Sequence, residues 1–102
     1  MKLLALLSLL AISATAWRAT VYKYSHHKGD AHTAADYSYG CYSLPRSWWD
    51  VASSIKTHDT CVAIYELSGC EGNYQILRPG TTCHFNLNDC GMDNTIRSIG
   101  PC

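Results

Sequence analysis

YELSGCEGNYQILRPG, residues 65–80, combines the residue types of a β-strand with repeated glycines. Tyr74 and its neighbours suit a strand, whereas Gly69 and Gly72 recur within a few positions and enclose Cys70. Glycine inside a strand marks a bulge, a tight bend or the close approach of another backbone. The stretch therefore predicts a sheet whose strands are short and interrupted.

Much of the chain shows a related pattern. Short runs rich in Val, Ile, Thr, Tyr and Phe lie between clusters of Gly, Asn, Asp and Ser, as in VAIYEL (62–67), NYQIL (73–77) and CHFNL (83–87). After residue 16, apolar residues hold a helical spacing for no more than about two turns. We therefore expect an all-β chain with strands of about four to six residues.

The N-terminal sixteen residues, MKLLALLSLLAISATA, have the pattern of a secretory signal peptide. Lys2 precedes an apolar run, and Ala14-Thr15-Ala16 supplies the small residues of a cleavage site. The apolar run is shorter than the roughly 20 residues that span a bilayer. We expect cleavage after Ala16, which leaves a secreted chain of residues 17–102 with a single domain.

Six cysteines lie in that secreted part: Cys41, Cys61, Cys70, Cys83, Cys90 and Cys102. An even number in a small secreted chain predicts disulfides, each of which contributes about 2–4 kcal/mol to stability. Zinc is the competing use, but the sequence has no C-x-x-C pair and the spacings do not suit a zinc ribbon.

Charge argues against nucleic acid as a partner. Without Lys2, seven Lys and Arg residues face eight Asp and Glu residues, and a phosphate-binding domain normally has a basic patch. Protonation of the histidines below pH ~6.5 would bring the net charge to about +4. The five are His26, His27, His32, His58 and His84.

The chain also repeats itself once. VYKY (21–24) corresponds to VAIY (62–65) at an offset of 41 residues, and DVASSIK (50–56) corresponds to NTIRSIG (94–100) at an offset of 44. Two copies are too few for a solenoid but suit two four-stranded units packed face to face as a β-sandwich. We place the first unit at about 17–58 and the second at about 61–102.

The second unit resembles the βγ-crystallin Greek-key motif. The residues that carry the resemblance are Tyr65, Glu66, Cys70, Gly72, Asp93, Asn94, Ile96, Ser98 and Ile99. The resemblance implies a two-Greek-key sandwich with a hairpin folded back on itself, in which the Tyr65 ring packs over Gly72. In the first unit Tyr24 leads to Gly29 and Ala31, which fit the pattern less well.

Cys61 and Cys102 bracket the second unit, so we expect this pair to be bonded. Closing a loop of about 40 residues contributes on the order of 4 kcal/mol. Six cysteines allow many other connectivities, and these stay open.

The resemblance also implies calcium sites, each shared between the two motif copies, Trp49–Ser54 and Asp93–Ser98. A site of Ser53, Asp93 and Asn94 keeps the oxygen ligands that calcium prefers. The other site has Arg97 in place of a hydroxyl. We therefore expect at most one weak calcium site and no other cofactor, and the alternative is that these residues only form hydrogen bonds in turns.

Two further groups of residues are candidates for binding. Trp48 and Trp49 are adjacent, so on an extended segment one ring points outward, where a partner or membrane interface would meet it. His26, His27 and His32, with Asp30 and Asp36, lack the regular spacing of metal ligands. We expect a solvated turn there.

Function is inferred mainly from the resemblance. The chain is similar to single-domain, cysteine-rich crystallin-like proteins such as yeast killer toxins, plant antimicrobial peptides and fungal extracellular effectors. We expect a non-enzymatic toxin or effector that binds a target-cell surface, a membrane or an extracellular protein, since no nucleophile elbow or paired-carboxylate signature is present. The alternatives are a host-directed effector that does not kill directly and a structural or calcium-binding extracellular protein. Oligomeric state stays open.

Overall fold

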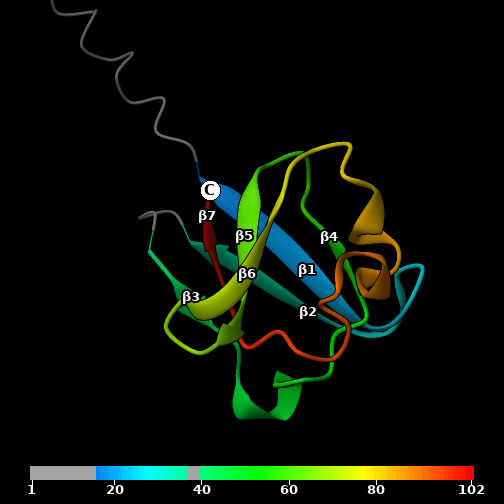
Figure 1. The fold of residues 1–102 in the computed structure, drawn as a ribbon, viewed down its shortest axis with the longest axis horizontal. Coiled ribbons are helices and arrows are strands. Elements are labelled where there is room, and N and C mark those ends of the chain that lie inside the picture. Colours follow the sequence, from blue (N-terminus) through cyan, green and yellow to red (C-terminus); the bar gives the residue numbers. More distant parts are fainter. Residues whose placement is uncertain (1–15, 37–39) are drawn as a thin grey trace, which may run out of the picture.

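The computed structural model describes residues 16–36 and 40–102 and has two antiparallel sheets (Figure 1). One sheet has the order β2-β1-β4, with bounds Lys28–Asp36, Trp17–Tyr24 and Ser54–Lys56. The other has the order β3-β7-β5-β6, with bounds Tyr42–Ser43, Ser98–Pro101, Val62–Leu67 and Glu71–Leu77. The all-β prediction is therefore confirmed, although the signal peptide predicted for residues 1–16 lies outside the described residues except for its last.

The sheets do not coincide with the two units. Strand β3 belongs to the first unit in sequence, yet it pairs with β7 at Tyr42↔Ile99 and Ser43↔Ser98. The first sheet consequently has three strands among the described residues rather than the four expected. The second sheet is therefore built from strands of both units.

The central strands are buried along consecutive residues rather than in strict alternation, since Thr20 in β1 and Ala63 in β5 are buried as well. In β1, Trp17, Ala19 and Val21 are buried, and in β5 Val62 and Ile64 are buried. These inward faces meet in one apolar core, which Ile55, Leu77, Leu87, Ile96 and Ile99 complete. Burying one such large aliphatic side chain contributes about 1.5–3 kcal/mol.

Three short 3₁₀ helices replace strands where disulfides and turns intervene. They are η1 (Arg46–Trp48), η2 (Thr82–His84) and η3 (Leu87–Cys90). The prediction that CHFNL (83–87) forms a strand is wrong, because Cys83 is bonded to Cys90 with only 5.8 Å between their Cα atoms. Seven extended residues would span roughly 23 Å, so the chain must coil. No helix among the described residues is long and apolar enough to cross a membrane.

All six cysteines are paired. Cys61 is bonded to Cys102, the pair favoured from the sequence, and Cys41 is bonded to Cys70. The Cys61–Cys102 disulfide links the start of β5 to the C-terminus. The Cys41–Cys70 disulfide links the folded β5–β6 hairpin to the segment before β3. Together with Cys83–Cys90 they are consistent with an extracellular protein.

Both units contain the folded hairpin, including the first, where the sequence fitted less well. Gly29 and Gly72 have φ angles of +82° and +84°, which side-chain-bearing residues rarely adopt. A Cβ on Gly29 would lie 2.5 Å from the Tyr24 ring, and a Cβ on Gly72 would lie 2.8 Å from Leu67. Thus Leu67, not Tyr65, covers Gly72, and the true offset between the hairpins is 43 residues, not 41. Because side chains repeat every two residues along a strand, a slip of two leaves the apolar pattern intact.

Candidate functional site: two equivalent turns

Two buried serines attach the folded hairpins to the sheets. Ser54 donates a hydrogen bond of 2.6 Å to the Tyr24 carbonyl and accepts one of 3.0 Å from the His27 amide. Ser98, 44 residues later, donates to the Leu67 carbonyl and accepts a 2.8 Å bond from the Cys70 amide. A hydroxyl serves here because it is both donor and acceptor.

The other motif residues of the second hairpin lie near its strands. Glu66 accepts a 3.1 Å hydrogen bond from Asn73 across the hairpin. The Tyr65 ring packs against Tyr74, with centroids 5.5 Å apart, and beside Gly100. These residues shape the hairpin on the outside of the sheet.

The segments that precede the serines form two turns related by approximate twofold symmetry. The Asp50 amide donates to the Ile96 carbonyl at 3.2 Å, and the Asn94 amide donates to the Ala52 carbonyl at 3.0 Å. Asp50 and Asn94 both have left-handed backbone conformations, with φ angles of 60° and 55°. Asp and Asn tolerate this region better than most residues. The turns therefore place Ser53 opposite Asn94 and Arg97 opposite Asp50.

One turn pair gathers oxygen atoms. Ser53 donates a 3.2 Å hydrogen bond to the Asn94 side-chain oxygen, and the Asn94 amide nitrogen donates to Asp93 Oδ2 at 3.3 Å. Asp93 Oδ1 is buried and has no hydrogen-bond partner among the described residues. Ser53 and Asp93 line a cleft of about 460 Å³ with Asn86 and Asn88. The three residues predicted for calcium thus lie together.

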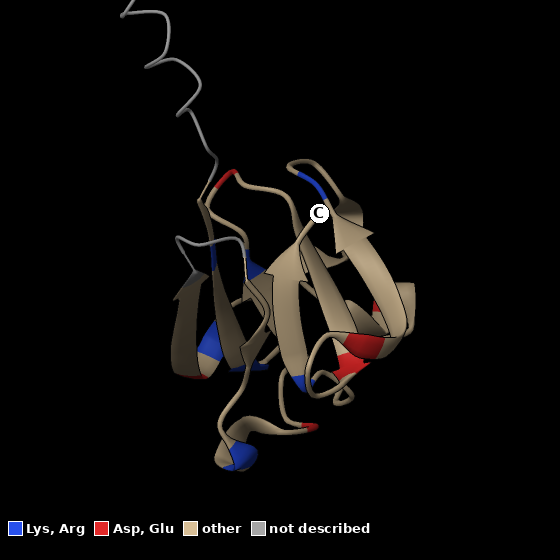
Figure 2. Ribbon diagram, turned by 90° about the vertical axis from the view of Figure 1, so that its left-hand side faces the viewer, with Lys and Arg blue, Asp and Glu red and all other residues tan. Residues whose placement is uncertain are grey.

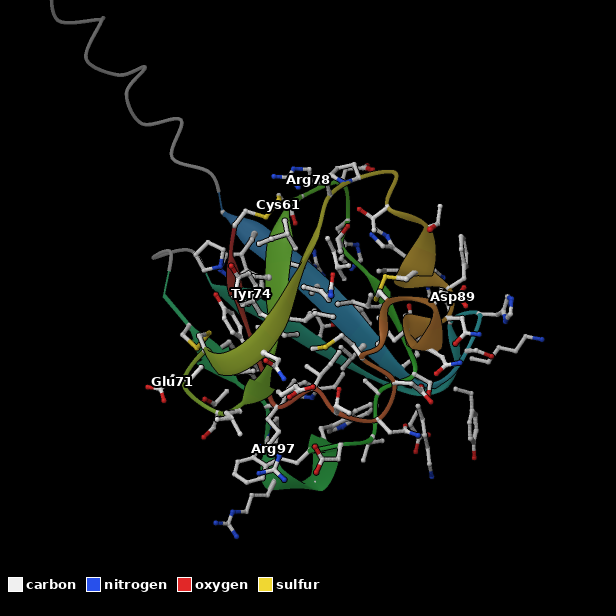
Figure 3. The ribbon with its side chains drawn as sticks, viewed as in Figure 1. Cys61, Glu71, Tyr74, Arg78, Asp89 and Arg97 are labelled. Carbon is white, nitrogen blue, oxygen red and sulfur yellow. A yellow bond between two sulfur atoms is a disulfide. The ribbon has the colours of Figure 1, made fainter. Side chains whose placement is uncertain are left out.

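At the other turn pair, the guanidinium of Arg97 occupies the position that corresponds to the predicted calcium site. Arg97 donates two hydrogen bonds to the Asp50 carboxylate, of 3.2 and 2.9 Å, and its guanidinium lies 4.7 Å from the centre of the Trp49 ring. The hydrogen bond from Arg97 lowers the pKa of Asp50, against a smaller opposing effect of desolvation. Figure 3 shows Arg97 beside η1, at the end of the molecule where that helix projects.

Trp48 and Trp49 are both half-buried, so neither has the fully exposed ring that adjacent positions on an extended segment suggested. Trp48 is the last residue of η1 and Trp49 follows it, so the helical turn removes the strict alternation of a strand. Trp48 packs against His32 with centroids 5.9 Å apart, and the Trp49 Nε1 donates to the Leu44 carbonyl. Arg46 covers Trp49 at 5.2 Å from the ring centre. A role for these two tryptophans in binding a partner stays a prediction.

The histidines of the first hairpin do not gather around a common point. His27 lies in the turn and donates to the Ile55 carbonyl at 2.9 Å, whereas His32 lies along β2 and bonds the Tyr42 hydroxyl at 2.9 Å. No group of three His, Cys, Asp or Glu side chains suited to a metal occurs among the described residues, and the Asp36 side chain lies outside them. The group at Asp93 is of a different kind, because its other oxygen atoms come from Ser53 and Asn94.

A second cleft, which we call the histidine cleft, was not anticipated from the sequence. It has a volume of about 580 Å³ between the chain at 55–59 and the chain at 79–85. Its lining includes His27, Thr57, His58, Pro79, His84 and Phe85. No local motif marks it, because its histidines come from three separate parts of the chain. Burial lowers the pKa of both His58 and His84.

Comparison with known proteins identifies the fold. No family model matches the chain, and no curated protein sequence matches it. Among solved structures, a βγ-crystallin from an archaeon has a TM-score of 0.70 and 24% identity, covering 86% of this chain and 100% of its own.

A βγ-crystallin from Ciona intestinalis has a TM-score of 0.68 and 17% identity, covering 83% of this chain and 99% of its own. A βγ-crystallin domain from Clostridium beijerinckii has a TM-score of 0.61 and 17% identity, covering 80% and 93%. These similarities show that the chain has the βγ-crystallin fold.

Proposed function

We propose that this protein is an extracellular, non-enzymatic crystallin-like domain that binds one calcium ion at Ser53, Asp93 and Asn94. The observation that carries the proposal is the buried Asp93 Oδ1, which has no hydrogen-bond partner among the described residues. A buried polar atom without a partner costs about 1–3 kcal/mol, and a charged one costs more. A cation beside it would remove that penalty.

The chemistry of the donors fits calcium. The site offers a carboxylate, a side-chain amide oxygen and a hydroxyl, and calcium takes oxygen ligands of these kinds. When bound, the ion supplies positive charge that compensates the Asp93 carboxylate. Because Ser53 comes from the first unit and Asp93 and Asn94 from the second, binding there would couple the two units. Arg97 performs the corresponding role for Asp50 at the other turn pair.

The test is a calcium titration of the oxidised protein followed by thermal unfolding. Calcium at ten times its Kd raises the free energy of unfolding by about 1.4 kcal/mol, which corresponds to roughly 6–11 °C in a domain of this size. Asp93→Asn should abolish this rise. Asp30→Asn, on strand β2, is the matched control and should retain it. An unchanged Tm in millimolar calcium for the unmodified protein contradicts the proposal.

A second candidate, the toxin or effector that binds a target-cell surface, is favoured by the distribution of charge. The strands of the β2-β1-β4 sheet contain four Lys or Arg residues against two Asp residues, namely Arg18, Lys23, Lys28 and Lys56 against Asp30 and Asp36. The strands of the other sheet carry only Glu66 and Glu71 (Figure 2). A face with an excess of cations attracts anionic lipid or polysaccharide, and the attraction weakens with salt.

The corresponding experiment exposes bacteria, yeasts and plant cells to the oxidised protein at about pH 5 and pH 7, with reduced protein as the control. Growth inhibition and dye entry that are stronger at pH 5 and lost on reduction support a folded toxin. Absence of any effect on microbes, together with capture of an extracellular protein, favours the host-directed effector instead.

A further inference from the structure

Two cations flank Thr20 on the outer face of the β2-β1-β4 sheet. Ala19 and Val21 are buried in the core, so the alternate residues Arg18 and Thr20 point outward. Thr20 is paired with Lys56 on β4, and the Cβ atoms of opposite residues lie within about 5.5 Å of each other. Arg18 and Lys56 are both exposed. Their positive charges therefore share one face and are open to solvent.

His58 joins this face from the turn that follows β4. Its Nε2 atom lies 2.8 Å from the Thr20 hydroxyl, and Thr20 is only 7% exposed although it points outward. The turn is attached to β1, because the Arg18 amide donates to the Thr60 hydroxyl at 3.3 Å. The same hydroxyl donates to the Thr57 carbonyl at 2.6 Å. The imidazole is therefore held against the sheet, while the His58 residue remains exposed.

Three side chains form a chain of hydrogen bonds across the face. The Thr20 hydroxyl lies 2.8 Å from His58 Nε2 and 3.0 Å from the hydroxyl of the exposed Thr33 on β2. In acid both ring nitrogens of His58 carry protons, so Nε2 donates to Thr20 and Thr20 donates to Thr33. The Thr33 hydroxyl then directs its own proton away from Thr20, toward a further acceptor. Protonation thus adds a positive charge and a hydrogen-bond donor together.

The charges around His58 favour an anion. Desolvation is the largest cause that lowers the pKa of His58, and the positive charges of Arg18 and Lys56 lower it further. An anion beside these two cations would offset their repulsion, so anion binding and protonation of His58 should promote each other. Asp59, in the same turn, has a smaller and opposite effect. The other histidines in the lining of the histidine cleft, to which His58 also belongs, are His27 and His84.

The chemistry of the face also selects the kind of anion. A carboxylate or a phosphate monoester loses negative charge in acid, where histidine gains positive charge, whereas a sulfate ester keeps its charge. Stable membrane binding would also require apolar side chains that enter the lipid. The β2 residues opposite Arg18 and Thr20 are Ala35 and Thr33, which are too small for that role. A sulfated polysaccharide needs only cations and hydrogen-bond donors on an open face.

We propose that Arg18, Lys56 and His58 bind a sulfate group of an anionic polysaccharide, and that they bind it more tightly in acid. Arg18 and Lys56 supply fixed positive charge, and Thr33 donates a hydrogen bond to the sulfate once His58 is protonated. The inference rests on the second candidate function, binding to a target-cell surface, because it names the group that is bound there. It does not depend on the calcium site.

The experiment follows the His58 ring of the isotopically labelled, oxidised protein by NMR during a pH titration, in sodium sulfate and in sodium chloride of equal ionic strength. Ionic strength is matched because screening alone weakens the repulsion from Arg18 and Lys56. We expect sulfate to raise the pKa of His58 by about one unit relative to chloride, which corresponds to about tenfold tighter binding by the protonated form. Equal pKa values in the two salts would overturn the proposal.

Charge variants locate the site. Arg18→Gln and Lys56→Gln should each weaken sulfate binding by about two- to fivefold, the range for an exposed charge pair. Lys23→Gln is the matched control, since Lys23 lies over the Tyr24 ring at the far end of β1. It removes the same charge and should leave sulfate binding unchanged. An equal loss in all three variants would mean attraction by net charge alone and no specific site.

Two further variants test the dependence on acid. His58→Gln cannot be protonated, so the difference in sulfate affinity between pH 7.5 and pH 5 should vanish. Thr33→Val removes the outward donor and should weaken binding more at pH 5 than at pH 7.5. A full acid preference in His58→Gln contradicts the role of His58, and an equal effect of Thr33→Val at both pH values contradicts the role of the hydroxyl.

Dextran sulfate, uncharged dextran and vesicles of phosphatidylglycerol identify the bound partner. At pH 5 we expect dextran sulfate to shift the His58 resonances and dextran to leave them unchanged. Tighter binding to the vesicles than to dextran sulfate, reduced in Arg18→Gln, would replace the polysaccharide by a membrane. Failure of the candidate function is a separate result: sulfate binding without any effect on cells leaves the site and removes the toxin, whereas killing without sulfate binding does the reverse.

Discussion

Replacing Ser54 or Ser98 by alanine should destabilise the protein more than any exposed Ser→Ala change. Each hydroxyl is completely buried and holds a folded hairpin through one donated and one accepted hydrogen bond. Alanine has nearly the same size, so packing is retained and only the hydrogen bonds are lost. The perturbation is therefore chemically simple, and it is repeated at two equivalent positions in one chain.

The magnitude follows from the groups left without partners. Ser54→Ala removes the partners of the Tyr24 carbonyl and the His27 amide. Each buried polar group that loses its partner costs about 1–3 kcal/mol. Both bonds are part-buried, so we expect about 2–4 kcal/mol in total, or a fall in Tm of roughly 8–30 °C. Ser98→Ala should cost a similar amount, because the Leu67 carbonyl and Cys70 amide lose equivalent bonds.

The assay is reversible unfolding in urea with all disulfides intact, followed by tryptophan fluorescence and circular dichroism. Ser43→Ala is the matched control, because its Oγ accepts an exposed 3.0 Å bond from the Gly69 amide that water can replace. The control should change the free energy of unfolding by less than about 0.5 kcal/mol. A loss below that value for Ser54→Ala or Ser98→Ala would refute the proposed role of the serines.

Three further predictions concern the hairpins, the second turn pair and pH. Gly29→Ala and Gly72→Ala should each cost at least about 1–2 kcal/mol in urea unfolding, because alanine is strained at positive φ and its Cβ meets a side chain. Arg97→Ser introduces a hydroxyl and removes the cation, so titration calorimetry should detect a second calcium ion bound per chain. An unchanged number of bound calcium ions would count against this prediction. The lowered pKa values of His58 and His84 mean that the unfolded chain binds protons first as pH falls below about 6.5. Stability should therefore decline from pH 7 to pH 5, and a flat profile would contradict this.

Local chemistry made much of the fold predictable. The glycine-rich hairpin at 65–80, the turn residues near Asp50 and Asn94, and the spacing of Ser54 and Ser98 are recognisable without coordinates, because each imposes its geometry on its own neighbours. The even number of cysteines likewise predicted a disulfide-bonded domain, and the resemblance to the βγ-crystallin motif implied the grouping of Ser53 with Asp93.

Other features depend on residues that meet only after the chain folds. The register of the repeat was wrong by two residues, because a period of two cannot distinguish Tyr65 from Leu67 as the cover of Gly72. The pairing of Arg97 with Asp50 spans 47 residues, and the histidine cleft joins three separate parts of the chain. Sequence by itself determined the hairpin strands, the turns and the cysteine content. Tertiary structure alone decided which side chains meet, since those contacts depend on how the two sheets pack.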